Sequence, residues 1–209
     1  MNIFPKLKKE KWVKLNLNSE SKKYPKVDFN DYNQCKKWIE LLHKKNKTDY
    51  SYGGLFEDRS NIWKGSYLQP TNSFIHLGID YNVPIGTSVA LPVNAKVENI
   101  VIDPNQNGGW GAGVKFKIEG TKHYMIYAHL THKLKLKIGD NISSGEIVAK
   151  TGKMTENGGW YPHLHLQIFT NKFDDLYMND IDRMDGYLPK GHPHLKYIVD
   201  PMKYVKLKD

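Results

Sequence analysis

The chain has 209 residues, of which 39% are hydrophobic and 12% aromatic, and it carries a formal net charge of +9. This apolar share suffices for a buried core, so wholesale disorder is excluded, and the length fits one domain with extensions better than two domains. No window approaches the roughly 18 uninterrupted apolar residues of a membrane span, and the single cysteine, Cys35, excludes an internal disulfide framework and a multi-cysteine zinc site.

The basic charge comes almost wholly from lysine. Of the 31 basic residues only Arg59 and Arg183 are arginines, and the other 29 are lysines. Arginine is the residue that hydrogen-bonds base edges and forms paired hydrogen bonds to phosphates, so we expect no nucleic-acid partner. The lysine charge is expected either to serve solubility alone or to attract an acidic polymer. The first ten residues are basic but no apolar run follows them, so no secretory signal is expected.

The first 65 residues are predicted to form a lysine-rich extension with one helix. Residues 1–27 show no convincing period, and residues 51–65 are predicted to be loop. A helix is predicted over about 30–46, capped by Asp28 or Asn30, because apolar residues recur there at i, i+3, i+4 and i+7. These residues are Cys35, Trp38, Ile39 and Leu42.

From about residue 66 the pattern changes to short β-type runs separated by Gly, Pro and Asn. No helical period interrupts them, which predicts a mainly β fold with an antiparallel sheet or sandwich rather than a βαβ fold. The β domain is expected to span 66–172, and a C-terminal extension, 173–209, is expected to pack on it. The protein is expected to be a monomer. The predicted strands are Ser88–Leu91, Ala95–Ile102, Val114–Ile118, Tyr124–Leu130, Glu146–Lys150 and His163–Phe169.

Three segments, 75–81, 126–130 and 163–168, alternate apolar and polar residues. Side chains alternate between the faces of a strand, so each segment should present its polar residues opposite an apolar face. If the polar faces converge, they form a wall that can hold a metal. The alternate apolar residues are Ile75, Leu77 and Ile79; Ile126, Ala128 and Leu130; and Leu164, Leu166 and Ile168. The polar residues between or beside them include His76, Asp80, His129, His163 and His165.

Zinc suits this set of side chains. Catalytic zinc sites use three protein ligands, and two His with one Asp meet that number and leave two His over. The spacing alone does not say which His are ligands. There is no His-Glu-x-x-His motif, so a histidine, which titrates in the useful range, is expected to handle the proton of the metal-bound water.

Glycine-rich loops at 107–111 and 157–162 flank these strands. They are either hairpin turns or the walls of a groove for an extended peptide. In the second interpretation Trp110, Trp160 and Tyr161 contact the substrate.

Residues from about 72 to 170 resemble the lysostaphin/LytM-type zinc metallopeptidases, which cut peptide bonds in bacterial cell-wall peptidoglycan. Five motifs carry the resemblance in order. They are His76-Leu-Gly-Ile-Asp80 with Val83-Pro-Ile-Gly-Thr-Ser-Val89, Gly111-Ala-Gly-Val114, Tyr127-Ala-His129-Leu130, Ile138-Gly-Asp140 through Gly145-Glu-Ile-Val-Ala-Lys-Thr-Gly152, and Pro162-His-Leu-His165.

The resemblance implies one Zn²⁺ bound by His76, Asp80 and His165, with His129 and His163 as catalytic histidines. It implies a peptidoglycan endopeptidase that acts at the cell envelope or outside the cell, although no leader is visible. Two departures are that Gln167 stands where Glu is common and that Trp160-Tyr161 replaces small residues.

Two rival interpretations stay open. Two His and one carboxylate also form the facial triad of non-haem Fe(II) oxygenases, although this leaves two strand histidines unexplained. A non-catalytic module of the same fold that binds or regulates at the cell wall is the other alternative.

Overall fold

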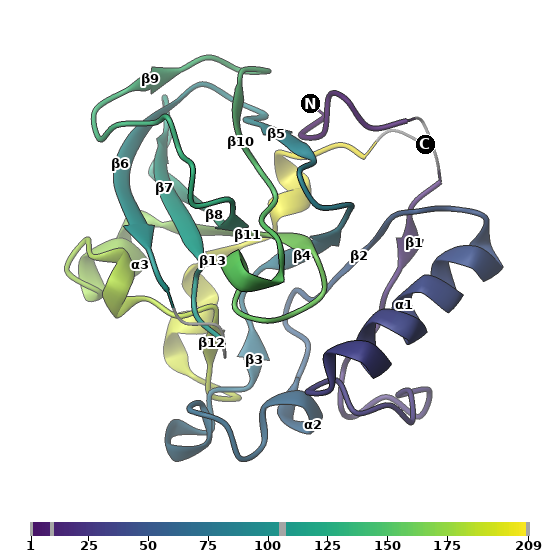
Figure 1. The fold of residues 1–209 in the computed structure, drawn as a ribbon. Helices are drawn as coiled ribbons and strands as arrows, with labels where there is room; N and C mark the ends of the chain where they lie inside the picture. The colour runs from purple at the N-terminus through teal and green to yellow at the C-terminus, as the bar shows by residue number, and fades with distance from the viewer. Residues whose placement is uncertain (1, 9–10, 105–107, 208–209) are drawn as a thin grey trace.

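The computed structural model describes residues 2–8, 11–104 and 108–207. Strands dominate it, which confirms the mainly β class (Figure 1). The strands are β1 (Val13–Lys14), β2 (Ser51–Gly53), β3 (Ile75–His76), β4 (Ile79–Asn82), β5 (Ser88–Ala90), β6 (Ala95–Ile102), β7 (Ala112–Ile118), β8 (His123–Leu130), β9 (Asn141–Ile142), β10 (Ile147–Lys150), β11 (His163–Thr170), β12 (Tyr187–Leu188) and β13 (Ile198–Val199).

The helices are short apart from the first. Across the described ranges, none combines the length and the apolar character that a membrane crossing needs. The α-helices are α1 (Tyr32–Asn46), α2 (Ser60–Trp63) and α3 (Asn171–Leu176), and the 3-10 helices are η1 (Gln69–Thr71), η2 (Met154–Glu156), η3 (Ile181–Arg183), η4 (Pro193–Tyr197) and η5 (Pro201–Lys203).

One large sheet organises the described part of the chain. Its order is β1-β2-β4-β11-β8-β7-β6-β9, and β13 pairs with the C-terminal part of β11. Its neighbours are antiparallel except for the parallel pair β1–β2. The pairs β5–β10 and β3–β12 form two smaller antiparallel sheets. Strand β11 therefore lies between β4 and β8, and side chains from these three strands are neighbours.

Apolar side chains cover both faces of the central strands. We call the larger group the main core; it includes Ile79, Tyr81, Met125, Tyr127, Leu130, Leu164, Leu166 and Ile168. The second core lies on the other face and includes Leu77, Ile126, Ala128, Phe169, Phe173, Ile181 and Met184. Polar side chains on the second face therefore sit at the edge of an apolar group, where water is scarce.

Helix α1 covers almost the whole predicted range. Its N-cap is Asp31, whose carboxylate accepts hydrogen bonds from the backbone N–H groups of Asn33 and Gln34, so the predicted caps Asp28 and Asn30 were wrong. The apolar stripe packs as the period requires, because Cys35 and Ile39 are buried against Leu15 and Leu17 in a third cluster.

The predicted loop at 51–65 was wrong, since it contains β2 and α2. The run Ser51-Tyr52-Gly53 is too short to show alternation, and it becomes a strand because β4 supplies its pairing edge. Gly53 is needed there, because a Cβ at this position would lie 2.1 Å from the carbonyl oxygen of Leu15. Part of the predicted extension is therefore built into the same sheet as β4.

Candidate metal centre

Strands β4 and β11 bring Asp80 and two histidines to one face. Asp80 lies directly opposite His165, and Asn82 lies opposite His163. The intervening residues of both strands, such as Tyr81, point into the main core. The predicted alternation is therefore found in this pair of strands.

His76 arrives from outside the large sheet. The predicted continuous strand over 75–81 was wrong, because the chain breaks at Leu77-Gly78 and β3 pairs instead with β12. Leu77 consequently enters the second core, whereas Ile79 enters the main core. A Cβ on Gly78 would lie 2.6 Å from Cε1 of His165, so only glycine lets the chain pass this close to the imidazole.

His129 reaches the same place through a β-bulge. Ala112 pairs with Leu130 but Val114 pairs with Tyr127, so β8 has one residue more than β7 between these pairs. His129 takes a φ of 63°, in the left-handed region. Strict alternation was therefore wrong for Leu130, which lies in the main core and not with Ala128.

The bulge brings the His129 ring next to two histidines of β11. Its centroid is 4.2 Å from that of His163 and 6.0 Å from that of His165. Bulges often redirect a side chain beside an active site. This bulge turns the His129 side chain to the face of the sheet that holds His163 and His165, which strict alternation would not allow.

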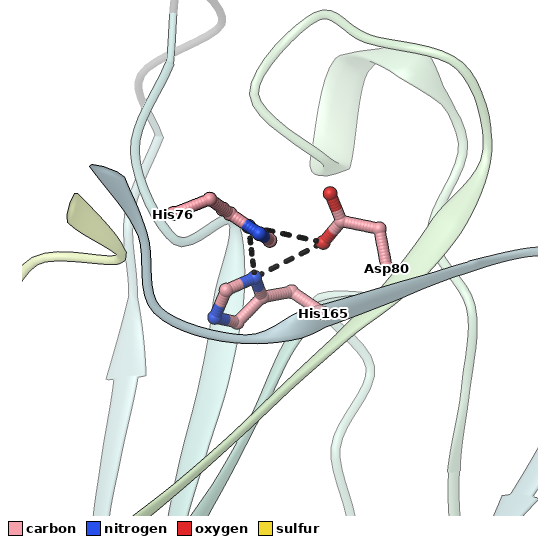
Figure 2. Close-up of side chains that lie close together, drawn as sticks. All are labelled: His76, Asp80 and His165. Carbon is pink, nitrogen blue, oxygen red and sulfur yellow. Dashed lines mark hydrogen bonds and ion pairs between the residues drawn. The ribbon is translucent and has the colours of Figure 1, made fainter. Parts of the chain in front are cut away.

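Three donor atoms converge on one point (Figure 2). His165 Nδ1 is 3.1 Å from Asp80 Oδ1 and 3.1 Å from His76 Nε2, and His76 Nε2 is 3.4 Å from Asp80 Oδ1. The three side chains are buried. Lone pairs this close repel one another in a dry site unless a proton or a cation lies among them.

Each of two rings has a hydrogen-bond partner on the nitrogen that points away from the Asp80 carboxylate. When the His165 lone pair is on Nδ1, the atom that faces Asp80, its Nε2–H donates to Oε1 of Gln167 at 3.3 Å. His163 Nδ1–H donates to the carbonyl oxygen of Tyr161 at 2.7 Å, so its Nε2 carries the lone pair. Gln167, the departure from the family pattern, can thus orient His165 as a carboxylate would.

Three of the histidines are held neutral, and the aspartate is held charged. Burial, helped by the Arg59 charge, lowers the pKa of His76 to about 3. Burial also lowers the pKa of His163, and that of His129 well below its usual range. Burial alone would raise the pKa of Asp80, but His76 and Arg59 outweigh it and hold that pKa well below its usual range. Neutral imidazoles with a carboxylate are the donor set that zinc prefers.

A cavity of about 250 Å³ opens onto these residues. Both predicted tryptophans, Trp110 and Trp160, line it, together with glycines 108, 109 and 158 of the two glycine-rich loops. Asn107 of the first loop lies outside the described residues. The Tyr161 side chain does not line this cavity but packs in the third cluster beside α1, and only its carbonyl reaches the site.

Sequence reasoning missed several residues of the site. Arg59 bonds to Asp80, and Tyr187 and Asp185 come from the C-terminal extension. Burial raises the pKa of Asp185 to about 6. The one available signal was compositional: Arg59 is one of two arginines in a chain that otherwise uses lysine.

Part of the chain matches a known protein family. Residues 74–175 match Peptidase family M23. An uncharacterized metalloprotease of Haemophilus influenzae is 33% identical over 96 residues, covering 46% of this chain and 19% of that protein. Glycyl-glycine endopeptidase ALE-1 of Staphylococcus capitis is 27% identical over 130 residues, covering 62% of this chain and 34% of that protein.

The fold agrees with a solved structure. The catalytic domain of the antimicrobial peptidase lysostaphin from Staphylococcus simulans aligns with a TM-score of 0.50 and 21% identity, over 80% of this chain and 95% of that one. The chain spans only about a fifth to a third of the length of the two curated relatives. Residues 74–175 of this chain are therefore a Peptidase family M23 domain.

Proposed function

We propose that this protein is a zinc-dependent endopeptidase that hydrolyses peptide bonds in bacterial cell-wall peptidoglycan. The observation that carries the proposal is the convergence of His76 Nε2, Asp80 Oδ1 and His165 Nδ1. The donor set fits zinc because two imidazoles and one carboxylate supply three ligands, as catalytic zinc sites require. Family membership and the name of the Staphylococcus capitis relative support a peptidase acting on peptides.

Zinc bound by these three residues would polarise the scissile carbonyl and acidify a water molecule. His163 is placed to accept the proton of that water, because Nδ1–H is committed to the Tyr161 carbonyl and Nε2, 4.0 Å from Asp80 Oδ1, is free to accept. His129 lies against His163 and can share the proton or stabilise the developing oxyanion. Lowered pKa values keep both rings neutral at neutral pH, so each has a nitrogen lone pair that carries no proton.

The cavity walls are suited to a peptide. Trp110 and Trp160 offer apolar faces, and the glycines beside them leave backbone groups open for hydrogen bonds to an extended chain. We propose that these two tryptophans contact the substrate, and that Tyr161 contributes through its backbone. Action at the cell envelope or outside the cell, as a monomer, is part of the same proposal, and acidic wall polymers are a second proposed partner because the chain has a net charge of +9.

Digestion of purified peptidoglycan tests the function. The protein should release new amino termini from cell walls, lose that activity with a chelator and regain it with zinc. Mass spectrometry of the fragments would identify the bond that is cut. If no termini appear with or without zinc, the protein is a non-catalytic module; stoichiometric iron and oxygen-dependent turnover would favour the oxygenase.

A further inference from the structure

We infer that Arg59 is a positioning residue of the metal centre: it holds one oxygen of Asp80 so that the other faces His76 and His165. Arg59 Nη1 donates to Asp80 Oδ2 at 2.6 Å, and Asp80 Oδ1 is the oxygen at 3.1 Å from His165 Nδ1. The two oxygens of one carboxylate thus have separate tasks. This inference rests on the proposed zinc site and assigns a role to a residue outside 74–175, the range that matches the family.

The backbone around Arg59 is arranged to admit its guanidinium. The Arg59 N–H donates to the Phe74 carbonyl at 2.9 Å, which ties this segment to the residue just before β3. Gly54 has a φ of 121°, and a Cβ there would lie 2.6 Å from both Arg59 Nη2 and His76 Nδ1. A side chain at this position would displace the guanidinium, the His76 ring, or both.

Further groups fix the orientation of the guanidinium. Arg59 Nη2 lies 3.4 Å from Glu57 Oε2, and Nη1 is 3.5 Å from the Tyr187 hydroxyl. That hydroxyl also accepts from Trp63 Nε1 at 2.8 Å. The Arg59 side chain is only 4% exposed, so these contacts hold it where solvent does not compete.

Lysine could not perform this task. The acceptors Asp80, Glu57 and Tyr187 lie around one planar group, and a guanidinium presents donors in a rigid fork, whereas an ammonium is a single point on a flexible stem. The guanidinium also stays charged at any accessible pH. A chain that uses lysine at 29 of its 31 basic positions has an arginine here.

Positioning and simple charge compensation predict opposite effects on metal affinity. A fixed positive charge beside a divalent cation repels it, so removing a mere counter-charge would tighten zinc binding. Removing a group that orients a ligand weakens binding, typically by 10- to 100-fold for partners of metal ligands. The sign of the change therefore distinguishes the two roles.

The experiment uses the 209-residue chain. Zinc affinity is measured by competition with a chromophoric chelator, and the geometry of the site is followed by the visible spectrum of the Co²⁺-substituted protein. Arg59→Lys keeps the charge and should weaken zinc binding about 10-fold and change the Co²⁺ spectrum, and Arg59→Met should weaken binding further. The control is the other arginine: Arg183 is exposed and pairs with Asp180, so Arg183→Lys and Arg183→Met should match the wild type.

Melting of the metal-free protein checks that each variant is folded. If Arg59→Lys does not fold, the same measurements on Tyr187→Phe decide, because this change removes one acceptor of Arg59 without altering charge; a wild-type Co²⁺ spectrum there would overturn the inference. Folded Arg59→Lys with wild-type affinity and spectrum, or Arg59→Met with tighter binding, would also overturn it. A wild-type protein that binds no zinc would instead remove the proposed function itself.

Discussion

Asp80 lies directly opposite His165 across the β4–β11 pair, and the two side chains meet at 3.1 Å between Oδ1 and Nδ1. Residues 85 positions apart in the sequence are thus made neighbours by strand register alone. Because side chains alternate along a strand, a register shift of one residue would send one of the two into the main core. The register of this strand pair therefore determines whether a metal can bind.

His129 and His165 should respond differently to replacement by alanine. His165→Ala removes a proposed ligand, so both zinc binding and peptidoglycan cleavage should be lost. His129→Ala should keep zinc at wild-type stoichiometry and lower turnover by about 100-fold, because it removes the proposed proton-handling group and none of the proposed ligands. Zinc analysis and release of amino termini measure the two effects. Wild-type turnover in His129→Ala would show that the roles are assigned wrongly.

Gly78→Ala should weaken zinc binding by at least about 10-fold, because the new Cβ would lie 2.6 Å from the His165 ring and 2.7 Å from the Leu166 carbonyl oxygen. Gly186→Ala is the matched control, since its Cβ would meet the same imidazole at an ordinary 3.5 Å. Chelator competition on both variants checks this. Equal zinc affinities would mean that the close passage at Gly78 has no part in holding His165.

Removing residues 1–65 should impair the protein rather than activate it. The deletion takes away β2, the hydrogen-bonding partner of β4, and Arg59, which bonds to Asp80. We expect a fragment starting at Ser66 to bind zinc at least about 10-fold more weakly than the full chain and to melt at a lower temperature. A folded fragment with higher activity would contradict this and show that the extension is inhibitory.

The metal-free protein should lose stability as the pH falls from about 7.5 to about 6. The pKa values of His76, His129 and His163 are lowered by burial in the folded state, whereas in the unfolded chain these groups titrate near about 6.5. Below that value the unfolded state binds protons that the folded state does not, so acid favours unfolding, by on the order of 1–2 kcal/mol over this range.

Asp185 acts in the opposite direction, because its pKa is raised to about 6 and the folded state holds its proton more tightly. This stabilising effect of acid lies mainly below pH 6, where the Asp185 carboxyl is protonated in the folded protein but ionised in the unfolded chain. Above pH 6 the histidines therefore dominate the change in stability. Thermal melts of the protein in the presence of a chelator, across the same pH range, measure the combined effect of the histidines and Asp185 on stability. A melting temperature that stays constant or rises on acidification would contradict the lowered histidine pKa values.

Several features could be predicted from local pattern alone. The helix near 30–46 follows from a period of 3.6, and the placement of Asp80 and His165 opposite the apolar faces of their strands follows from a period of 2. The meeting of these two side chains was implied only by the family resemblance. The family resemblance also implied that His76 joins Asp80 and His165. The course of the backbone from His76 to Asp80 could not be predicted, because the break at Gly78 depends on how closely the chain passes His165.

Other features depend on tertiary structure. His129 was expected at the site from simple alternation, yet it gets there through a bulge that alternation does not contain. Strand β2 exists because β4 offers an edge, and Arg59 belongs to the site because it bonds to Asp80. No short window of sequence encodes such contacts, so residues 51–65 resembled a loop.

Crystals of the full-length protein grown with zinc, measured on both sides of the zinc absorption edge, test the central claim most directly. We predict one anomalous peak within about 2.0–2.2 Å of His76 Nε2, Asp80 Oδ1 and His165 Nδ1. A peak bound by other residues, or no peak in crystals that contain zinc, would contradict the account.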